Sequence, residues 1–121
     1  MSIEINGKII KTDEQGYLLN GDDWNVEVRE ALIEKHEAEG YRFVSEDMRG
    51  LISYFRDYYQ KNKIQPSMYK MALTLEQNYN DKYCQQGSEI NCLYELFPHG
   101  PVRMLFKLAG LRNPFYPNLS Y

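Results

Sequence analysis

One segment near the middle of the chain carries the clearest helical pattern and limits what the rest can fold into. Apolar side chains recur there every three or four residues, which places them on one face of an α-helix. These residues are Met48, Leu51, Ile52, Phe55 and Tyr59. Ser45 can cap the start, and Glu46 and Asp47 put acids at the positive end of the helix dipole. We expect this helix to run to about Lys61 and to need an apolar partner.

Four further helices are predicted from the same spacing and from the residues that interrupt it. Their expected ranges are about 24–38, 67–79, 90–97 and 101–109. Gly40 and Gly110 stand where helices end, and Pro66 pushes the residue before it out of the helical region. Gly100-Pro101 suits a helix start, because proline is favoured at the first helical position. The chain is therefore expected to be mostly helical.

The first twenty residues have a different pattern. Asn6-Gly7 separates Ile3-Glu4-Ile5 from Lys8-Ile9-Ile10, and this dipeptide tolerates the positive backbone angles of a tight hairpin turn. After the turn residues 12–16, Tyr17-Leu18-Leu19 can add a short third strand. Asn20-Gly21-Asp22-Asp23 then breaks the pattern and offers a helix N-cap. The predicted class is α+β: a small N-terminal β-hairpin or meander against about five helices.

The length of 121 residues fits one domain. We expect that domain to span residues 1–111. Residues 112–121 contain Pro114 and Pro117 around Phe115-Tyr116, so they are predicted to form an extended, flexible C-terminal arm.

The formal net charge of -3 and the pI near 5.4 argue against a nucleic-acid partner, which clustered Lys and Arg would announce. No apolar run approaches the roughly 20 residues that span a bilayer, and the start Met1-Ser2-Ile3-Glu4-Ile5 does not resemble an export signal. The sequence thus predicts a cytoplasmic protein without membrane contact.

Motifs of known chemistry are missing. No Gly-rich phosphate loop, G-x-S-x-G nucleophile turn or H-x-x-x-H metal motif is present. His36 and His99 are isolated and are interpreted as surface or hydrogen-bonded histidines. We predict no cofactor, no metal site and no catalytic residue, so the chain is not expected to be an enzyme.

The two cysteines, Cys84 and Cys92, are too few and too far apart for a zinc ribbon or a C-x-x-C pair. Both are expected to be free thiols. Cys92 lies in an apolar segment, where cysteine usually packs as a small hydrophobe. Cys84, in a polar segment with Lys82 nearby, is the more reactive candidate.

Residues 98–121 include Arg103, Lys107 and Arg112 and contain no Asp or Glu. This end of an otherwise acidic chain is locally basic. It is either a solvated helix face or, together with Tyr121, a docking surface for an acidic protein partner.

Several short motifs resemble the DsrC/TusE family in order and approximate spacing. The most specific is Leu93-Tyr94-x-Leu96-Phe97-Pro98-x-Gly100-Pro101, followed by Ala109-Gly110-Leu111-x-x-Pro114. The weaker ones are Gly16-Tyr17-Leu18, Asp23-Trp24, Arg56-Asp57-Tyr58-Tyr59 and Ile64-x-Pro66. The likeness covers nearly the whole chain and implies a small β-sheet against a helical array.

The resemblance also implies a C-terminal arm with a penultimate cysteine that carries sulfur as a persulfide, and in some members a second cysteine in the last helix. This sequence departs at both places. Ser120 takes the penultimate position, and Phe106 takes that of the second cysteine. A serine hydroxyl lacks the nucleophilicity of a thiol, so it cannot hold a persulfide. The family route to a carrier is therefore excluded for this sequence.

The sequence favours a non-catalytic partner-binding or regulatory protein linked to sulfur metabolism, through sulfite reductase or tRNA 2-thiolation systems. Two alternatives stay open: a persulfide carrier that uses Cys84 or Cys92, and a nucleic-acid-binding regulator with a helix-turn-helix near Pro66. A protein partner of the sulfur-transfer type is expected, while the oligomeric state is not predicted. We expect Phe106 to lie outward or half-exposed, because the arm of a family member must reach the cysteine at that position.

Overall fold

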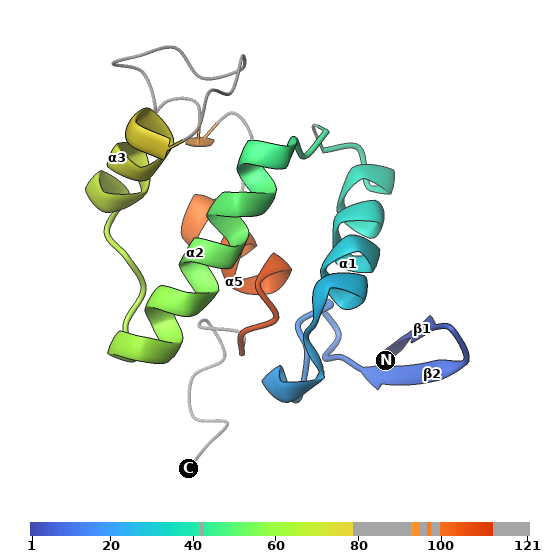
Figure 1. Ribbon diagram of the computed structural model, residues 1–121. Helices are drawn as coiled ribbons and strands as arrows, with labels where there is room; N and C mark the ends of the chain where they lie inside the picture. Colours follow the sequence, from blue (N-terminus) through green and yellow to red (C-terminus); the bar gives the residue numbers. More distant parts are fainter. Residues whose placement is uncertain (42, 79–92, 95–96, 98–99, 113–121) are drawn as a thin grey trace.

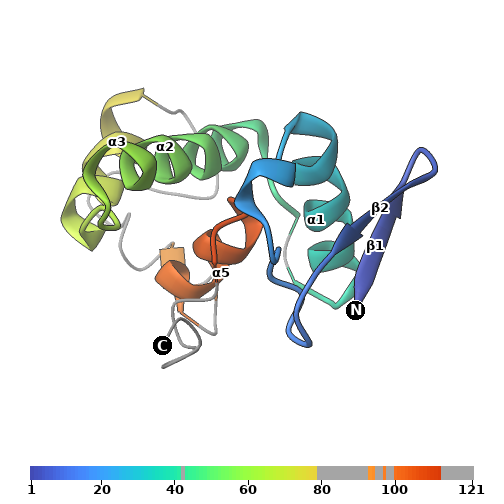
Figure 2. The ribbon, with the colours of Figure 1, turned by 90° about the horizontal axis from the view of Figure 1, so that it is seen from below.

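The fold is described by a computed structural model that covers residues 1–41, 43–78, 93–94, 97 and 100–112. The N-terminal hairpin lies to one side of a helical array (Figure 1). Helix α2 runs across the array between α1 and α3, and α5 lies against α2 and α1 (Figures 1 and 2). The elements in chain order are β1 (Ser2–Ile5), β2 (Lys8–Lys11), the 3-10 helix η1 (Gly21–Asp23), α1 (Val26–Ala38), α2 (Glu46–Asn62), α3 (Met68–Asn78) and α5 (Pro101–Leu108).

The predicted hairpin is confirmed. Strands β1 and β2 pair antiparallel, from Ser2 opposite Lys11 to Ile5 opposite Lys8. Asn6 and Gly7 both have positive φ, 52° and 82°, as this tight turn requires. Ile10 is buried, whereas Ile9 is exposed, so β2 covers the helical array with one face.

The predicted third strand is wrong as a strand. Only an isolated bridge joins Thr12 to Leu18. The Asp13 carboxylate accepts hydrogen bonds from the backbone N–H groups of Gln15 (2.8 Å) and Tyr17 (3.0 Å), which closes a turn. Tyr17 and Leu18 are then both buried, although a strand would alternate them. This segment packs against the core of the helical array and does not extend the sheet.

Helix α1 begins two residues later than expected. Asn25 caps it, with its side chain accepting a hydrogen bond from Val28 N at 2.9 Å. Asn20 caps η1 by the same kind of bond, 3.0 Å to Asp22 N. The polar segment before α1 thus forms a separate turn of 3-10 helix, which positions Trp24.

Helix α2 matches its prediction closely. The Ser45 hydroxyl accepts from Met48 N at 3.2 Å, and Lys63, with φ of 61°, ends the helix in the left-handed conformation. Arg49 pairs with Glu30 at 2.9 Å and joins α2 to α1. The hydrogen bonds from Arg49 lower the pKa of Glu30, so this carboxylate stays charged at neutral pH.

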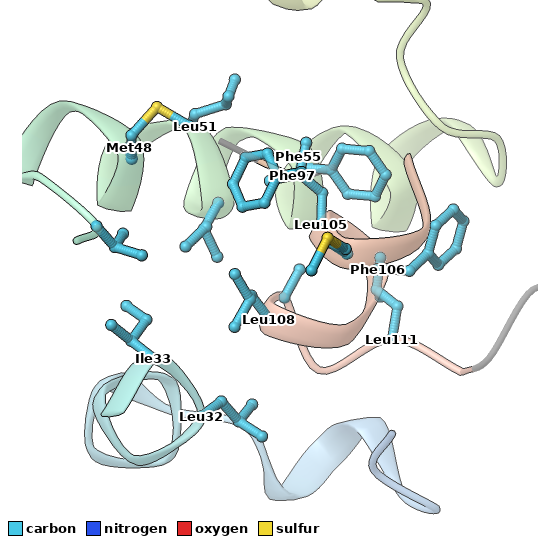
Figure 3. Close-up of a cluster of buried hydrophobic side chains, with 14 of the residues drawn as sticks. Leu32, Ile33, Met48, Leu51, Phe55, Phe97, Leu105, Phe106, Leu108 and Leu111 are labelled. Atoms are coloured by element: carbon cyan, nitrogen blue, oxygen red, sulfur yellow. The ribbon is translucent and has the colours of Figure 1, made fainter. Parts of the chain in front are cut away.

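The core lies where α2, α1 and α5 meet (Figure 3). The stripe residues Met48, Leu51, Ile52 and Phe55 are fully buried, as predicted. They pack in one cluster with residues of α1 and α5, including Leu32, Ile33, Leu105 and Leu108. Most of the predicted helix 90–97 lies outside the described residues, but Leu93 and Phe97 belong to the same core. The α+β class is confirmed.

Candidate functional site

Helix α5 is the element around which the candidate site is built. Pro101 occupies its first turn after Gly100, whose φ of 107° suits glycine at this chain reversal. Two sides of the helix differ in what they contact. Phe106 packs on α2, whereas Lys107 reaches the loop at Gly16 and Tyr17. One side of α5 therefore belongs to the core, and the other contacts the loop.

Phe106 is buried, so the expectation of an outward or half-exposed ring is wrong. Its side chain is only 3% exposed. The ring meets Phe55 edge-on, with centroids 5.1 Å apart, and Tyr59 at 5.2 Å in the same geometry. Such edge-to-face pairs are favourable beyond the area that they bury. The position that the family resemblance matches to a cysteine is filled here by an aromatic core residue (Figure 3).

Where α5 ends, the indole of Trp24 and the guanidinium of Arg56 hold the chain. Arg56 donates to the carbonyl oxygens of Ala109 (2.8 Å) and Gly21 (2.9 Å). Its guanidinium carbon lies 4.6 Å from the centroid of the Trp24 ring, and the indole N–H donates to Leu108 O at 3.0 Å. We call Trp24, Arg56 and Gly110 the α5 clamp, because they fix where the chain leaves α5.

Burial lowers the pKa of Arg56, and the nearby carboxylates of Asp57 and Asp22 oppose that effect. The guanidinium nevertheless stays charged, because the ordinary pKa of arginine lies far above neutral pH. A buried charge needs good hydrogen bonds to offset desolvation. The two carbonyl bonds and the indole face supply them.

We expect Arg56→Lys to lower the free energy of unfolding by about 2–3 kcal/mol, since an ammonium cannot reproduce the planar fork that reaches two carbonyls and stacks on Trp24. Urea unfolding followed by far-UV circular dichroism measures the change. Arg112→Lys, at an exposed position, is the control and should change stability by under about 0.5 kcal/mol. Equal effects of the two substitutions would show that the clamp contributes nothing specific.

On the other side of α5, a cavity of about 160 Å³ opens between α5, the end of α1 and the loop at residues 13–17. Aromatic rings, two cations and one carboxylate surround it. The lining residues are Gln15, Tyr17, His36, Glu39, Tyr41, Arg103, Met104 and Lys107. We call this the α5 cavity.

His36 forms a buried part of the wall of the α5 cavity. It is 5% exposed, so of its two predicted settings, surface or hydrogen-bonded, the surface one is wrong. The imidazole stacks on Tyr41 with centroids 4.6 Å apart, and the Phe97 ring lies at 5.9 Å. Its Nε2 atom is buried without a hydrogen-bond partner among the described residues. Burial is the main cause that lowers the pKa of His36, so the ring is neutral at neutral pH.

This lowered pKa predicts a pH-dependent stability. The unfolded chain, with an ordinary histidine pKa near 6.5, binds a proton more readily than the folded chain. The stability from neutral His36 is therefore complete above about pH 6.5 and is lost as the pH falls through the folded pKa. We expect the urea midpoint to fall between about pH 7.5 and 5.5. His36→Phe should flatten this slope; equal slopes for wild type and His36→Phe would contradict the assignment.

Tyr17 and Lys107 shape the other wall. Burial raises the pKa of Tyr17 to about 12, so the phenol stays protonated and donates to Arg103 O at 3.1 Å. The Lys107 ammonium lies 5.9 Å from the centroid of the Tyr17 ring. A Cβ on Gly16 would come within 2.8 Å of Lys107 Cε, and the φ of Gly16 is +90°. Glycine there lets Lys107 lie against the loop.

The structure brings together only part of the predicted docking surface. Arg103 and Lys107 line the α5 cavity, and Arg112 is exposed just beyond α5. Cys84, Cys92, Ser120 and Tyr121 lie outside the described residues. Within the described part of the chain, no group of three or more His, Cys, Asp or Glu residues could hold a metal ion. None of the helices in that part is both long and apolar enough to span a membrane.

The sequence analysis did not predict the structural roles of Arg56 and His36. Arg56 does carry a signal, since it follows Ile52 by four residues and so falls on the apolar stripe of α2. A charged residue on a buried stripe indicates a paired or hydrogen-bonded role. His36 likewise follows Leu32 by four residues on α1. Its stack on Tyr41 depends on the turn after α1, which spacing does not determine.

Comparison with known proteins agrees with this geometry. The family of DsrC like proteins matches residues 4–116. The gamma subunit of dissimilatory-type sulfite reductase from Nitratidesulfovibrio vulgaris is 37% identical over 93% of this chain and 93% of its own length. A protein named sulfurtransferase TusE from Yersinia pestis is 33% identical over 93% of this chain and 95% of its own.

Solved structures give the same result. The oxidized gamma subunit of dissimilatory sulfite reductase (DsrC) from Archaeoglobus fulgidus superposes with a TM-score of 0.73 and 28% identity. The matched region covers 94% of this chain and 96% of the Archaeoglobus fulgidus chain. The DsrC structure from Allochromatium vinosum gives 0.68 at 28% identity, with the same coverage.

The fold is thus that of a small α+β domain in which Trp24 and Arg56 hold the end of helix α5. The chain belongs to the DsrC-like family, which includes DsrC and TusE proteins. Several motifs that carried the resemblance in the sequence meet in space at the α5 clamp: Asp23-Trp24, Arg56 and Ala109-Gly110.

Proposed function

We propose that this protein is a partner-binding component of a sulfur-relay or sulfite-reduction system and that it performs neither carrier nor catalytic chemistry. Family membership over residues 4–116 supports the system. The relatives' names, a sulfite reductase gamma subunit and a sulfurtransferase, point to the same chemistry.

One observation carries the non-carrier part of the proposal. The sequence contains no cysteine after Cys92, and Phe106 fills a helix position with a ring buried on Phe55 and Tyr59. Neither α5 nor the segment after it therefore offers a thiol, and a persulfide requires one. What this chain shares with the DsrC structures is the fold.

The docking face that we propose comprises Arg103, Lys107 and Arg112. Arg103 and Arg112 are exposed and Lys107 is half-buried. The α5 clamp holds the end of this helix through Arg56 and Trp24, so the cations project from a fixed support. Cations on a rigid element suit an acidic surface on a partner protein, because less side-chain and backbone freedom is lost on binding.

The test is capture of purified partners by the protein and its charge variants. The baits are the catalytic subunits of a dissimilatory sulfite reductase and, separately, a sulfurtransferase. We expect Arg103→Glu to weaken the affinity about tenfold or more, since reversing a charge opposite an acidic patch adds repulsion. Lys61→Glu, an exposed position on α2, is the matched control and should bind as wild type. Capture of neither bait by the wild-type protein would contradict the proposed function.

The rival hypothesis, a persulfide carrier on Cys84 or Cys92, has its own test. The protein is incubated with a cysteine desulfurase and cysteine, and its intact mass is measured. We expect no stable gain of one sulfur atom on either thiol. A gain that Cys84→Ser or Cys92→Ser abolishes would overturn the non-carrier proposal.

A further inference from the structure

The α5 cavity shares Arg103 and Lys107 with the proposed docking face, but its volume and the buried Nε2 of His36 are used by neither the fold nor that face. Its volume of about 160 Å³ is about five times the share of one water molecule in the liquid. A cavity lined by apolar groups alone can stay empty, but this one is lined by an imidazole, an amide, two phenols, a thioether and three charged side chains. Polar walls of this kind are expected to hold water or a polar ligand.

Positive charge is concentrated at the cavity. Arg103 and Lys107 line it one helical turn apart, and the Lys35 ammonium lies 4.0 Å from the point where a Gly16 Cβ would stand. The Lys107 ammonium lies 3.2 Å from that same point. Among the described residues, no carboxylate oxygen is within ion-pairing distance of Lys107 Nζ. Two ammonium groups are thus held near one loop without an ion-pair partner for Lys107.

Two of the acidic groups nearby have hydrogen-bond partners of their own, although their negative charge still acts at the cavity. Asp13 is engaged in the turn, where it accepts from Gln15 N and Tyr17 N. Glu37 accepts from Val44 N at 2.7 Å. Among the described residues of the lining, Glu39 is the one that carries a carboxylate, against the two cations there and Lys35 beside them.

His36 is the second, independent observation. Its Nε2 is buried without a partner in the described part of the chain, and the residue is part of the cavity wall. Buried polar atoms are nearly always hydrogen-bonded, so an orphan at a cavity indicates a missing partner. Nε2 itself has almost no accessible surface, so an anion in the cavity would reach it only after a small movement of the ring. A nearby anion would in any case favour the protonated imidazole.

We propose that the α5 cavity binds a small sulfur oxyanion, of the sulfate or thiosulfate class, against Lys107, Arg103 and His36. The size and charge of the cavity support an oxyanion, and the choice of sulfur chemistry rests on the proposed function. The α5 clamp holds the helix that carries two of the three groups. No partner protein is needed for this binding, so its failure and a failure of the docking proposal are separable.

The experiment is a ¹H–¹⁵N NMR titration of the isolated protein with sulfate and with thiosulfate, at ionic strength held constant with chloride. Both anions remain dianionic near neutral pH, so the ligand itself does not titrate. We expect saturable shifts at Gly16, Tyr17 and Lys107. Lys107→Met should weaken binding about tenfold or more, because it removes a charge-assisted contact and keeps a similar stem. Lys61→Met is the control and should bind as wild type.

The titration of the His36 ring gives an independent readout. The groups around it are Glu37, Glu39 and Lys107, with Tyr41 stacked on the ring. We expect saturating sulfate to raise the pKa of His36 relative to chloride, so that binding tightens as the pH falls. His36→Phe should weaken binding at pH 6 more than at pH 8. Should that variant fail to fold, the Lys107→Met comparison still decides.

Three results would overturn the proposal. Shifts that chloride reproduces, or that never saturate, would show ionic-strength effects alone. Equal binding by Lys107→Met and Lys61→Met would place the anion elsewhere. Phosphate that binds tenfold more tightly than both sulfur oxyanions would overturn the sulfur assignment.

Discussion

Phe106→Ala is expected to lower the free energy of unfolding by about 3–5 kcal/mol, the cost typical of truncating a buried aromatic ring. The ring is 3% exposed and meets Phe55 and Tyr59 edge-on, with centroids 5.1 and 5.2 Å away. Truncation would remove both contacts and leave a void between α5 and α2. Urea or guanidinium unfolding at one pH, with midpoint and slope both fitted, measures the loss.

Tyr69→Ala provides the matched aromatic control. Tyr69 is on α3 and is 67% exposed, so the change should cost under about 1 kcal/mol. A loss under about 1 kcal/mol for Phe106→Ala as well would mean that the ring does not fill the core. Phe106→Cys, which restores the residue type implied by the family resemblance, should also destabilise, because a thiol fills less of the space between the two aromatic rings.

The sequence predicted the helices because each has its own signals. The stripe of α2, the Ser45 cap and the proline before α3 are local signals, and the structure confirms both helices. Helix α5 was found equally well, yet the environment of Phe106 was predicted wrongly. Its buried residues include Met104, Leu105, Phe106 and Leu108, which cover more than one side of the helix. Spacing alone does not say which side meets α2.

The candidate site was harder to predict for a different reason. The clamp joins residues that are far apart in the chain: Arg56 bonds Ala109, 53 residues away, and Trp24 bonds Leu108, 84 residues away. Local pattern identifies neither pair. The family motifs did include Trp24, Arg56 and Ala109, but a motif does not say which residues are in contact. The α5 cavity also combines three separate segments, so only the basic pair Arg103 and Lys107 was recognised.

Gly110→Ala should be among the most damaging single substitutions at the clamp. Gly110 has a φ of +69°, where alanine is strained by about 1–2 kcal/mol. A Cβ there would also lie 2.2 Å from Trp24 Cδ1 and 2.6 Å from Cγ. Overpacking of this kind costs a further 1–3 kcal/mol or so. We expect a total loss of about 3 kcal/mol or more in equilibrium unfolding.

Two comparisons separate the strain of the backbone from the collision with the indole. Gly7 has a similar φ of +82° with nothing within 4 Å of its Cβ position, so Gly7→Ala should cost only the backbone part, about 1–2 kcal/mol. In a Trp24→Ala background the two closest atoms are gone but the Cβ of residue 24, 2.8 Å away, remains, so Gly110→Ala should then cost less than in the wild type and more than Gly7→Ala. The coupling from this double-mutant cycle should therefore be about 1–3 kcal/mol. If Gly110→Ala cost the same with and without the indole, Trp24 would not hold the end of α5, and the rigid support that we propose for Arg103 and Lys107 would lose its basis.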